Sequence, residues 1–429
     1  MEIKEIYTRF LQCTSACTDT RKFFTQDCMF FALKGENFDG NYFVEQALEL
    51  GARYCVVDNP DHQGKDCILV DDVLSTLQQL ATHHRNQLNF PIIALTGSNG
   101  KTTTKELINA VLSKKFRTIA TIENLNNHIG VPLTILAMNK KTEIGIVEMG
   151  ANHPKEIEFL CKIAQPDYGL ITNFGRAHLE GFGSIEGVIR AKSELYDYLK
   201  AHQKTIFVNE NDKIQVQQAA AYDRVLYFGQ MDPDGPELEL ISSQPYVTLH
   251  YNTHTINCKL TGEYNFTNIT AAIRIGSYFG VTPDAIASAI ENYTPTNKRS
   301  QIIEKSTNTI ILDTYNANPT SMMAAIENLK QLEKQDKTLI LGDMFELGNA
   351  SGSEHQNIVD YLENNKIGKV YLVGENFFNT ITNPDNVDIR KFETFDTLKS
   401  ELTESPIKDS TVLIKGSRGM VLERVLEFL

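Results

Sequence analysis

A glycine-rich loop followed by a lysine and three threonines is the clearest chemical signal in the chain. Residues 96–104 read TGSNGKTTT, after the apolar run PIIALTG and before the run TTTKELINAVLSKK. Glycines let a backbone curl around phosphate oxygens, and successive N–H groups at a helix N-terminus supply positive potential. The spacing predicts that Lys101 neutralises the β- and γ-phosphates of a nucleotide and that the Thr102 hydroxyl binds Mg²⁺. The predicted nucleotide-binding residues of this loop are Gly97, Ser98, Asn99, Gly100, Lys101, Thr102 and Thr103.

The loop departs from the general phosphate-binding pattern at one position. Leu95 stands where that pattern has a glycine, five residues before Gly100, so the loop has the shorter form G-x-x-G-K-T. The alternative interpretation is a polar turn between a strand and a helix that binds nothing. The apolar strand before the loop and the amphipathic helix after it favour phosphate binding.

Three further side chains stand where chemistry is plausible, each with a plain structural alternative. Glu148 ends the apolar run TEIGIVEMG, and open α/β sheets bind ligands at the carboxyl ends of their strands. It could equally be a surface carboxylate that caps a turn. His178 lies in a glycine-rich stretch, where a histidine alone is unremarkable. Lys192, in RAKSEL, has the position of an exposed helical charge.

The elements that must position these residues alternate between strands and helices. The runs TEIGIVEMG, DYGLITNFG and KTIFVNE predict buried strands, and amphipathic helical stretches lie between some of them. This alternation predicts an α/β fold with mostly parallel sheets covered on both faces. A terminal helix is expected after the last strand, TVLIKGS.

The length of 429 residues suggests three domains at about 150 residues each. Residues 1–88 mix short apolar runs with turn signals and predict a small α/β domain. Residues 89–296 form the central domain of the glycine-rich loop, and the segment NYTPTNKR (292–299) predicts a linker. Residues 297–429 alternate again and predict a Rossmann-like domain.

Composition excludes several classes of protein. The net charge of −13 argues against sequence-independent nucleic-acid binding, which needs a basic face. No run approaches the ~18 apolar residues of a membrane helix, and the charged start MEIKEIYTRF predicts no secretory signal. The seven cysteines contain no C-x-x-C pair, so we expect buried free thiols, no zinc site and a cytoplasmic location.

With its neighbours, the loop resembles the ATP loop of the Mur ligases, the family that adds amino acids to UDP-N-acetylmuramic acid. Further segments similar to that family occur in order along all three predicted domains. YNANP and LGDMFELG resemble the member that adds D-alanyl-D-alanine, and the segment FFALKGENFDGNYFVEQALELGA resembles its UDP-binding domain. The other similar segments are NLNNHIGVPLTIL (124–136), VEMGANHPKEI (147–157), TNFGRAHLEGFGSIEGVIRAKSEL (172–195), GEYNFTNITAA (262–272) and KGSRGM (415–420).

The resemblance implies two Mg²⁺ ions and a modified lysine. It assigns one ion to Glu148 with Thr102 and a second to His178, and it implies that CO₂ carbamylates Lys192. A carbamate turns an ammonium into an anion, which suits a position beside two divalent cations and a phosphorylated intermediate. The residues with implied catalytic roles are Lys101, His178, Lys192 and Arg299.

The resemblance also implies the remaining contacts. Asn265 and Asn268 would meet the adenine edge, although both could instead cap a helix over residues 268–279. Arg299 would reach the γ-phosphate as the last domain closes, and Asp313 would hold the ribose hydroxyls. For Arg299, solvation in a polar linker is the alternative. The implied substrate-binding residues are Asp19, Thr20, Arg21, Lys34, Gly35, Asn37, Asn126, Asn127, Thr134, Tyr315, Asn316, Asn318, Lys415, Ser417 and Arg418.

The implied activity is an ATP-dependent ligase reaction through an acyl phosphate, which joins D-alanyl-D-alanine to UDP-N-acetylmuramoyl-tripeptide. A monomer is expected, and the sequence leaves lysine or diaminopimelate open at the third peptide position. The alternatives are a sister ligase that adds diaminopimelate or lysine, a folylpolyglutamate synthetase-like ligase, a small-molecule kinase and a nucleotide-gated binding scaffold. YNANP with LGDMFELG counts against the sister ligase, and the long N-terminal segment counts against the synthetase.

Overall fold

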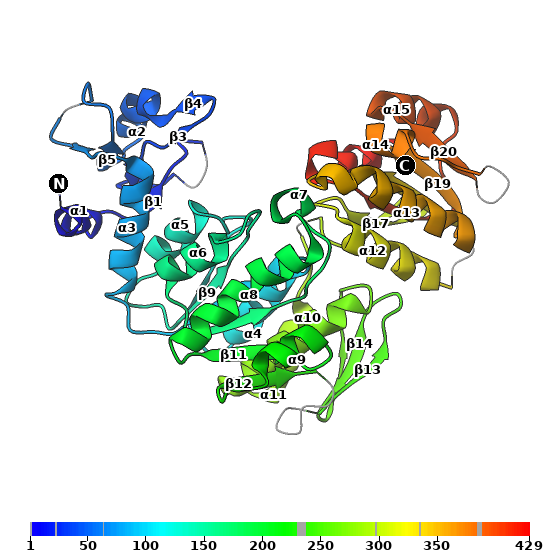
Figure 1. The fold of residues 1–429 in the computed structure, drawn as a ribbon, viewed down its shortest axis with the longest axis horizontal. Helices are drawn as coiled ribbons and strands as arrows, with labels where there is room; N and C mark the ends of the chain where they lie inside the picture. Colours follow the sequence, from blue (N-terminus) through cyan, green and yellow to red (C-terminus); the bar gives the residue numbers. More distant parts are fainter. Residues whose placement is uncertain are drawn as a thin grey trace.

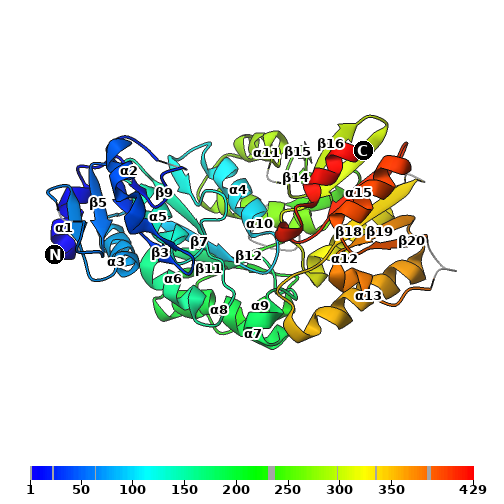
Figure 2. The same ribbon diagram turned by 90° about the horizontal axis from the view of Figure 1, so that it is seen from above.

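The computed structural model describes residues 2–21, 24–62, 64–229, 237–296, 298–333, 336–383 and 388–429. The chain folds into three bodies, each built around its own parallel or mostly parallel sheet (Figure 1). The first and last bodies lie at opposite ends of the molecule, and the middle one connects them (Figure 2). The predicted class, α/β with three such units, is confirmed.

The N-terminal body has a small parallel sheet of order β1-β2-β5-β6. Its last helix, α3, begins after Asp72, whose side chain accepts from the backbone N–H of Ser75. The strands are β1 (Ala16–Cys17), β2 (Met29–Phe31), β5 (Tyr54–Val57) and β6 (Cys67–Leu69), with the hairpin β3 (Lys34–Gly35) and β4 (Phe38–Asp39). The helices are α1 (Ile3–Phe10), η1 (Gly40–Phe43), α2 (Val44–Glu49) and α3 (Val73–Arg85).

The middle body has a six-stranded parallel sheet of order β12-β11-β10-β7-β9-β8. Its strands are β7 (Ile92–Thr96), β8 (Thr118–Ala120), β9 (Ile144–Glu148), β10 (Tyr168–Ile171), β11 (Thr205–Asn209) and β12 (Val225–Phe228). Its helices are α4 (Lys101–Leu112), α5 (Gly130–Ala137), α6 (Glu156–Ala164), α7 (Leu179–Phe182), α8 (Ile185–Ala201), α9 (Lys213–Ala219), α10 (Tyr264–Tyr278) and α11 (Pro283–Asn292). The chain adds β8 and β9 on one side of β7 and then β10 on the other, so the crevice at the switch in strand order lies beside β7.

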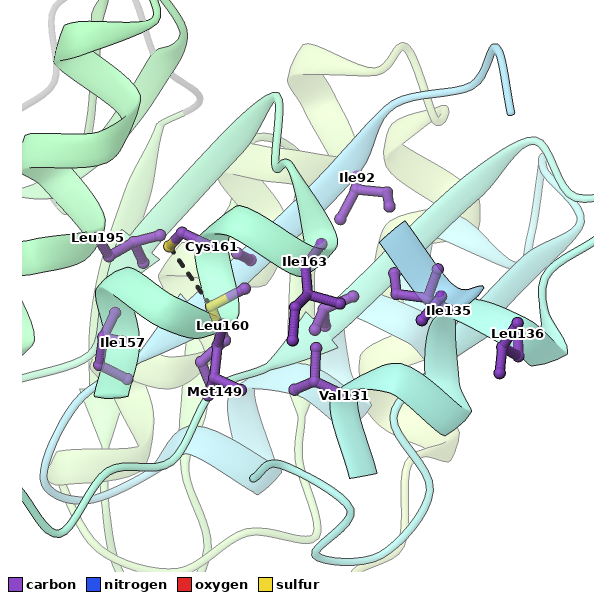
Figure 3. Packing of buried hydrophobic residues seen from close by; sticks show 14 of the residues in the cluster. Ile92, Val131, Ile135, Leu136, Met149, Ile157, Leu160, Cys161, Ile163 and Leu195 are labelled. Atoms are coloured by element: carbon purple, nitrogen blue, oxygen red, sulfur yellow. Dashed lines mark hydrogen bonds between the residues drawn. The ribbon is translucent and has the colours of Figure 1, made fainter. Parts of the chain in front are cut away.

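Alternate residues of β7 enter two separate cores. Ile92 and Ala94 face the core shared with α3, α5, α6 and α8, and Ile93 and Leu95 face the core of α4, α10 and α11. Figure 3 shows the first core, where side chains from α5, α6 and α8 converge and Cys161 Sγ lies 3.7 Å from Met149 Sδ. That core continues into the N-terminal body through α3, because Leu77 and Leu80 belong to the same cluster.

A small antiparallel sheet packs on the α4 side and was not foreseen. Its strands are β13 (Leu238–Ser242), β14 (Thr248–Tyr251) and β15 (His254–Asn257). Leu238, Leu249 and Ile256 bury their side chains in the second core. The strands have only four or five residues each, too few for their alternation of buried and exposed side chains to give a clear sequence signal.

The C-terminal body has a six-stranded sheet of order β16-β17-β21-β18-β19-β20. The edge strand β16 is antiparallel to β17, so the sheet is mixed and departs from a purely parallel arrangement. The strands are β16 (Gln301–Lys305), β17 (Asn308–Asp313), β18 (Lys337–Gly342), β19 (Lys369–Val373), β20 (Ile389–Phe392) and β21 (Thr411–Lys415). The helices are α12 (Pro319–Gln331), η2 (Gly348–Ala350), α13 (Ser351–Asn365), α14 (Glu375–Phe378), α15 (Phe395–Glu404), η3 (Arg418–Met420) and η4 (Leu422–Phe428).

The sequence predicted a helix at the end of the chain and free cysteines. The expected terminal helix is present, and it is the 3₁₀ helix η4 over residues 422–428. All seven cysteines are free, as expected, and five of them are buried.

Among the described residues, none of the helices combines the length and the apolar character needed to cross a membrane. Residue 297, the expected first residue of the third domain, lies outside the described residues.

Side chains of the second core of the middle body should contribute strongly to its stability. Leu107 of α4 is fully buried there, so Leu107→Ala should cost about 2–5 kcal/mol of unfolding free energy through lost contacts and a residual cavity. A thermal melt should show a midpoint lowered on the order of 10 °C. Leu11→Ala removes the same atoms from a side chain that is 63% exposed and should leave the melt nearly unchanged. Equal losses for both variants would contradict this assignment of the core.

Candidate functional site

The glycine-rich loop runs from β7 into α4, and two of its glycines have backbone angles that other residues rarely adopt. Gly97 has φ 142° and Gly100 has φ 78°. A Cβ atom at Gly97 would lie 2.0 Å from Thr172 Oγ1. The Thr172 hydroxyl in turn donates to the carbonyl of Asn99 (2.6 Å), and Asn173 Oδ1 accepts from the Asn99 N–H (3.1 Å). The loop after β10 therefore holds the glycine-rich loop in shape.

Lys101 folds back across the loop that precedes it. Its ammonium donates to the carbonyls of Gly97 (2.7 Å) and Ser98 (3.3 Å). Burial lowers the pKa of Lys101 to about 8, while Glu148 opposes this effect and Arg299 adds to it. A partly desolvated cation in a loop of backbone N–H groups is suited to an anion such as a nucleotide phosphate.

Glu148, at the end of β9, carries a buried carboxylate with one free oxygen. Its Oε1 accepts from Asn126 Nδ2 (2.8 Å) and from the Thr102 hydroxyl (3.2 Å). Its Oε2 is buried and has no hydrogen-bond partner among the described residues. An unpaired buried oxygen of this kind is costly unless a ligand completes it.

The donor chemistry at Glu148 fits Mg²⁺, which prefers oxygen ligands and keeps several from water and phosphate. Thr102 and Glu148 would hold the ion, and no cluster of three His, Cys, Asp or Glu side chains suited to a metal forms in the described part of the chain. The remaining ligands would therefore come from phosphate oxygens and water.

His178 precedes α7 in a left-handed backbone conformation, with φ 53°. Its Nδ1 lies 2.5 Å from Oε2 of Glu346, which belongs to the C-terminal body. The contact lowers the pKa of the Glu346 carboxyl. Sequence reasoning missed Glu346 as a site residue, although it lies within LGDMFELG.

Lys192 of α8 is fully buried, so the interpretation as an exposed helical charge is wrong. Its ammonium donates to the carbonyl of Ala151 (3.1 Å) and lies 5.1 Å from the centre of the Phe182 ring. Burial lowers the pKa of Lys192 well below its ordinary value, and the charge of Lys101 lowers it further. Lys192 lies behind the surface of the cleft, whereas Ala151 lines it.

Asn265 and Asn268 lie inside α10, so the expectation that they cap its start is wrong. The helix begins at Tyr264, shortly after Gly262, whose φ is 86°, so both asparagines fall within its first turns. Asn268 Oδ1 accepts from the Thr104 hydroxyl (3.1 Å), and Asn268 Nδ2 donates to Asn265 Oδ1 (2.9 Å). The pair thus joins α10 to the first turn of α4 at the wall of the cleft.

The C-terminal body supplies the opposite wall. The Arg299 guanidinium lies 3.7 Å from the centre of the Tyr315 ring, and its Nε has no partner within the described residues. Asp313 Oδ2 pairs with Lys415 (2.5 Å), and Oδ1 accepts from the N–H of Ser300 (3.1 Å). Arg299 is therefore held by a ring face, with donors left for a ligand.

Asn318 joins the two walls. Its side chain caps α12 by accepting from the Ser321 N–H (2.9 Å). Its Nδ2 also donates to Asn99 Oδ1 (2.7 Å) in the glycine-rich loop. The Asn318 side chain therefore caps a helix of the C-terminal body and contacts the glycine-rich loop of the middle body.

These residues surround a cleft of about 820 Å³ between the middle and C-terminal bodies. Such a volume suits a ligand of nucleotide size. The predicted residues that line it are Ser98, Asn99, Gly100, Lys101, Thr102, Thr103, Asn126, Asn127, Glu148, His178, Asn265, Asn268, Arg299, Asp313, Tyr315, Asn316, Asn318 and Lys415.

Other predicted residues lie away from the cleft surface. Thr134 turns its hydroxyl to the Gly130 carbonyl of its own helix (2.9 Å), and Ser417 Oγ accepts from the Phe345 N–H (2.8 Å). Arg418 lies 5.4 Å from the centre of the Tyr315 ring.

The N-terminal candidates form a separate group, in the body at the far end of the molecule from the C-terminal one (Figure 1). Arg21 pairs with Asp19 (2.9 Å), Lys34 pairs with Asp58 (2.9 Å), and the Thr20 hydroxyl contacts Gln46 (3.2 Å). Gly35 and Asn37 belong to the β3–β4 hairpin region.

Comparison with known proteins places these features in one family. Residues 95–276 match the Mur ligase middle domain, and residues 298–418 match the Mur ligase, glutamate ligase domain. The chain is 37% identical to the UDP-N-acetylmuramoyl-tripeptide–D-alanyl-D-alanine ligase of Bacillus subtilis (96% of this chain, 92% of that protein). The Escherichia coli protein of the same name is 33% identical over the same shares of the two chains.

Solved structures of proteins with similar sequences have a similar fold. The fold is similar to that of MurF from Acinetobacter baumannii, with a TM-score of 0.83 at 33% identity over 96% of this chain and 92% of that one. It is also similar to the MurF ligase from Thermotoga maritima in complex with ADP, with a TM-score of 0.84 at 27% identity over 98% and 97%.

The lowered pKa of Lys101 predicts a proton-linked affinity for nucleoside triphosphate. The lowered pKa predicts that much of Lys101 is neutral at pH 8.5 in the ligand-free protein. A bound phosphate restores the charge, so nucleotide binding should take up a proton and weaken as pH rises. Calorimetric titrations at pH 8.5 in two buffers of different ionisation heat measure this uptake. In Lys101→Met the same titration should lose it; an unchanged uptake would assign the proton to another group.

Proposed function

We propose that this chain, which belongs to the Mur ligase family, uses ATP to join D-alanyl-D-alanine to UDP-N-acetylmuramoyl-tripeptide, with release of ADP and phosphate. The observation that carries the proposal is the cleft in which Lys101, the free oxygen of Glu148 and Arg299 meet. Two relatives named UDP-N-acetylmuramoyl-tripeptide–D-alanyl-D-alanine ligase are 37% and 33% identical to this chain over almost its whole length. We assign residues 1–88 to the UDP end of the substrate, 89–296 to ATP and 297–429 to domain closure and the dipeptide.

The chemistry follows from the poor reactivity of a carboxylate toward amines. The terminal carboxylate oxygen of the tripeptide attacks the γ-phosphorus, the bond to the β-phosphate oxygen breaks, and ADP leaves. The dipeptide amine then attacks the acyl carbon, phosphate leaves with the carboxylate's former oxygen, and the amine loses a proton. Lys101 and Arg299 neutralise the phosphates, so the protein acts mainly by positioning and by electrostatic stabilisation.

Magnesium would be held by Thr102 and Glu148, and when bound it neutralises phosphate charge. We assign a second ion to His178. Asn265 and Asn268 would contact the adenine, and Asp313 would release Lys415 in part to receive the ribose hydroxyls. Asn126 and Asn127 line the cleft and would meet the muramoyl peptide. Tyr315, Asn316 and Asn318 would border the incoming dipeptide.

A carbamate on Lys192 completes the proposal. Only a neutral amine adds CO₂, and burial already disfavours the ammonium of Lys192. The nitrogen forms a bond to the carbon of CO₂ and gives up a proton, which leaves an anionic oxygen pair that hard Mg²⁺ prefers to nitrogen. The Ala151 carbonyl, which now accepts from this ammonium, would then accept from the carbamate N–H. We place the reaction in the cytoplasm and the enzyme as a monomer.

The reaction is tested by phosphate release with purified protein, ATP and Mg²⁺. Release should require both UDP-N-acetylmuramoyl-tripeptide and D-alanyl-D-alanine, with little turnover when lysine, diaminopimelate or glutamate replaces the dipeptide. Lys101→Ala should lower turnover by at least ~10³-fold, as when one transition-state contact is lost, while the melting temperature stays close to that of the parent. Equal turnover with glutamate and a folate acceptor would exclude the proposed substrates.

The carbamate is tested at Lys192 itself. Lys192→Ala should lose most activity, and acetate or formate at high concentration should restore part of it by supplying a carboxylate in the vacated space. Lys192→Arg should stay inactive, because a guanidinium keeps its charge and cannot form a carbamate. Mass spectrometry after trapping with an alkylating reagent should detect the added CO₂. Parent-like activity in Lys192→Arg would rule the modification out.

A further inference from the structure

The contact between His178 and Glu346 joins the middle body to the C-terminal body beside the cleft. Besides the 2.5 Å approach of the two side chains, the Glu346 carbonyl accepts from the N–H of Glu180 in α7 (3.1 Å). Leu179, next to His178, packs against the core of the C-terminal body. Helix α7 therefore contacts the C-terminal body as well as the middle body, and it lies between the two in Figure 1.

The segment that carries Glu346 is braced on both sides of it. The buried carboxylate of Asp343 accepts from the N–H groups of Asn376 and Phe377 (both 2.9 Å). The Met344 N–H donates to His355 Nε2 (3.0 Å). After Glu346, the side chain of Leu347 is buried in the same core.

Glu346 itself has a left-handed backbone, with φ 61°, which is uncommon for a residue other than glycine. Such a conformation persists only where the surroundings fix it. The bracing on either side supplies that constraint, so the segment presents one carboxylate to the other body in a set direction.

The chemistry of the pair decides which nitrogen of His178 carries a proton. An ionised carboxylate carries no proton, and a 2.5 Å approach of two unprotonated atoms would be repulsive, so the proton lies on Nδ1, although its N–H is not aligned on Glu346 as in an ordinary hydrogen bond. A neutral imidazole then keeps its free electron pair on Nε2, on a ring that lines the cleft. Histidines with a ligand role commonly have this arrangement, with a carboxylate holding the other nitrogen.

We propose that Glu346 is a positioning residue that fixes the tautomer and ring orientation of His178, so that docking of the C-terminal body completes the cleft. The effect on turnover rests on the proposed function. Other contacts hold the two bodies together without touching His178, among them Arg176 with Glu354 (2.5 Å) and Asn328 with Thr261 (2.8 Å). Glu346 is therefore separable from docking itself.

The proposal is tested first without substrates. In protein with ¹⁵N-labelled histidines, long-range proton–nitrogen spectra distinguish the two tautomers, and His178→Gln assigns the signal. The parent should show His178 with the proton on Nδ1. Glu346→Ala should lose this preference, and Arg176→Ala, the matched control that breaks the neighbouring contact, should keep it. An unchanged His178 signal in Glu346→Ala would overturn the proposal.

Turnover provides the second readout. Glu346→Ala should lower kcat about 10–100-fold, the usual effect of removing such a partner, with KM for D-alanyl-D-alanine within about twofold. Glu346→Gln should recover part of kcat, because its amide oxygen still accepts from Nδ1. If Gln were as poor as Ala and KM for the dipeptide rose, Glu346 would be binding the incoming amine, and the positioning role would be wrong.

The two proposals fail in different ways. An enzyme with no turnover on the muramoyl substrates would remove the proposed function, while the tautomer of the ligand-free protein would still decide the role of Glu346.

Discussion

The pairing of β7 with β9 is the constraint on which the site depends. Its register sets Leu95 opposite Glu148, so the carboxylate emerges beside the loop that begins immediately after β7. A slip of one residue would turn Glu148 to the other face of the sheet and bury Val147 or Met149 against the wrong core. The alternation of Ile92 and Ala94 with Ile93 and Leu95 between two cores forbids that slip, so hydrophobic packing fixes the distance between Thr102 and Glu148.

Lysine side chains are desolvated in this part of the middle body, at some cost to the fold. Lys101, Lys105 and Lys192 all have pKa values lowered first by burial, in a chain whose net charge is −13. Desolvated ammonium groups are unfavourable until an anion meets them. The overall acidity of the protein thus says little about the cleft, where local charge is opposite in sign to the total.

Sequence reasoning reached the strands, the glycine-rich loop and Glu148 because each depends on neighbours along the chain. It did not find residues whose contact partners lie far away along the chain. Nothing near Lys192 signals that Phe182 and Ala151 will enclose it, since α8 also carries the charged residues Arg190 and Glu194 two positions away on either side. Asn173 is the second residue after β10 and could have been found by the rule that ligands gather at the carboxyl ends of strands. Glu346 could not, because its partner lies in another body of the protein.

The two cores of the middle body also carry a consequence for the order in which the chain acquires structure. In the described part of the chain, no residue after Tyr293 belongs to either of them, and the first is shared with α1 and α3 of the N-terminal body. Synthesis from the N-terminus therefore delivers every side chain of both cores before β16 exists. The C-terminal body has cores of its own, so it folds last and as a separate unit. It then packs against a middle body whose cores are already complete.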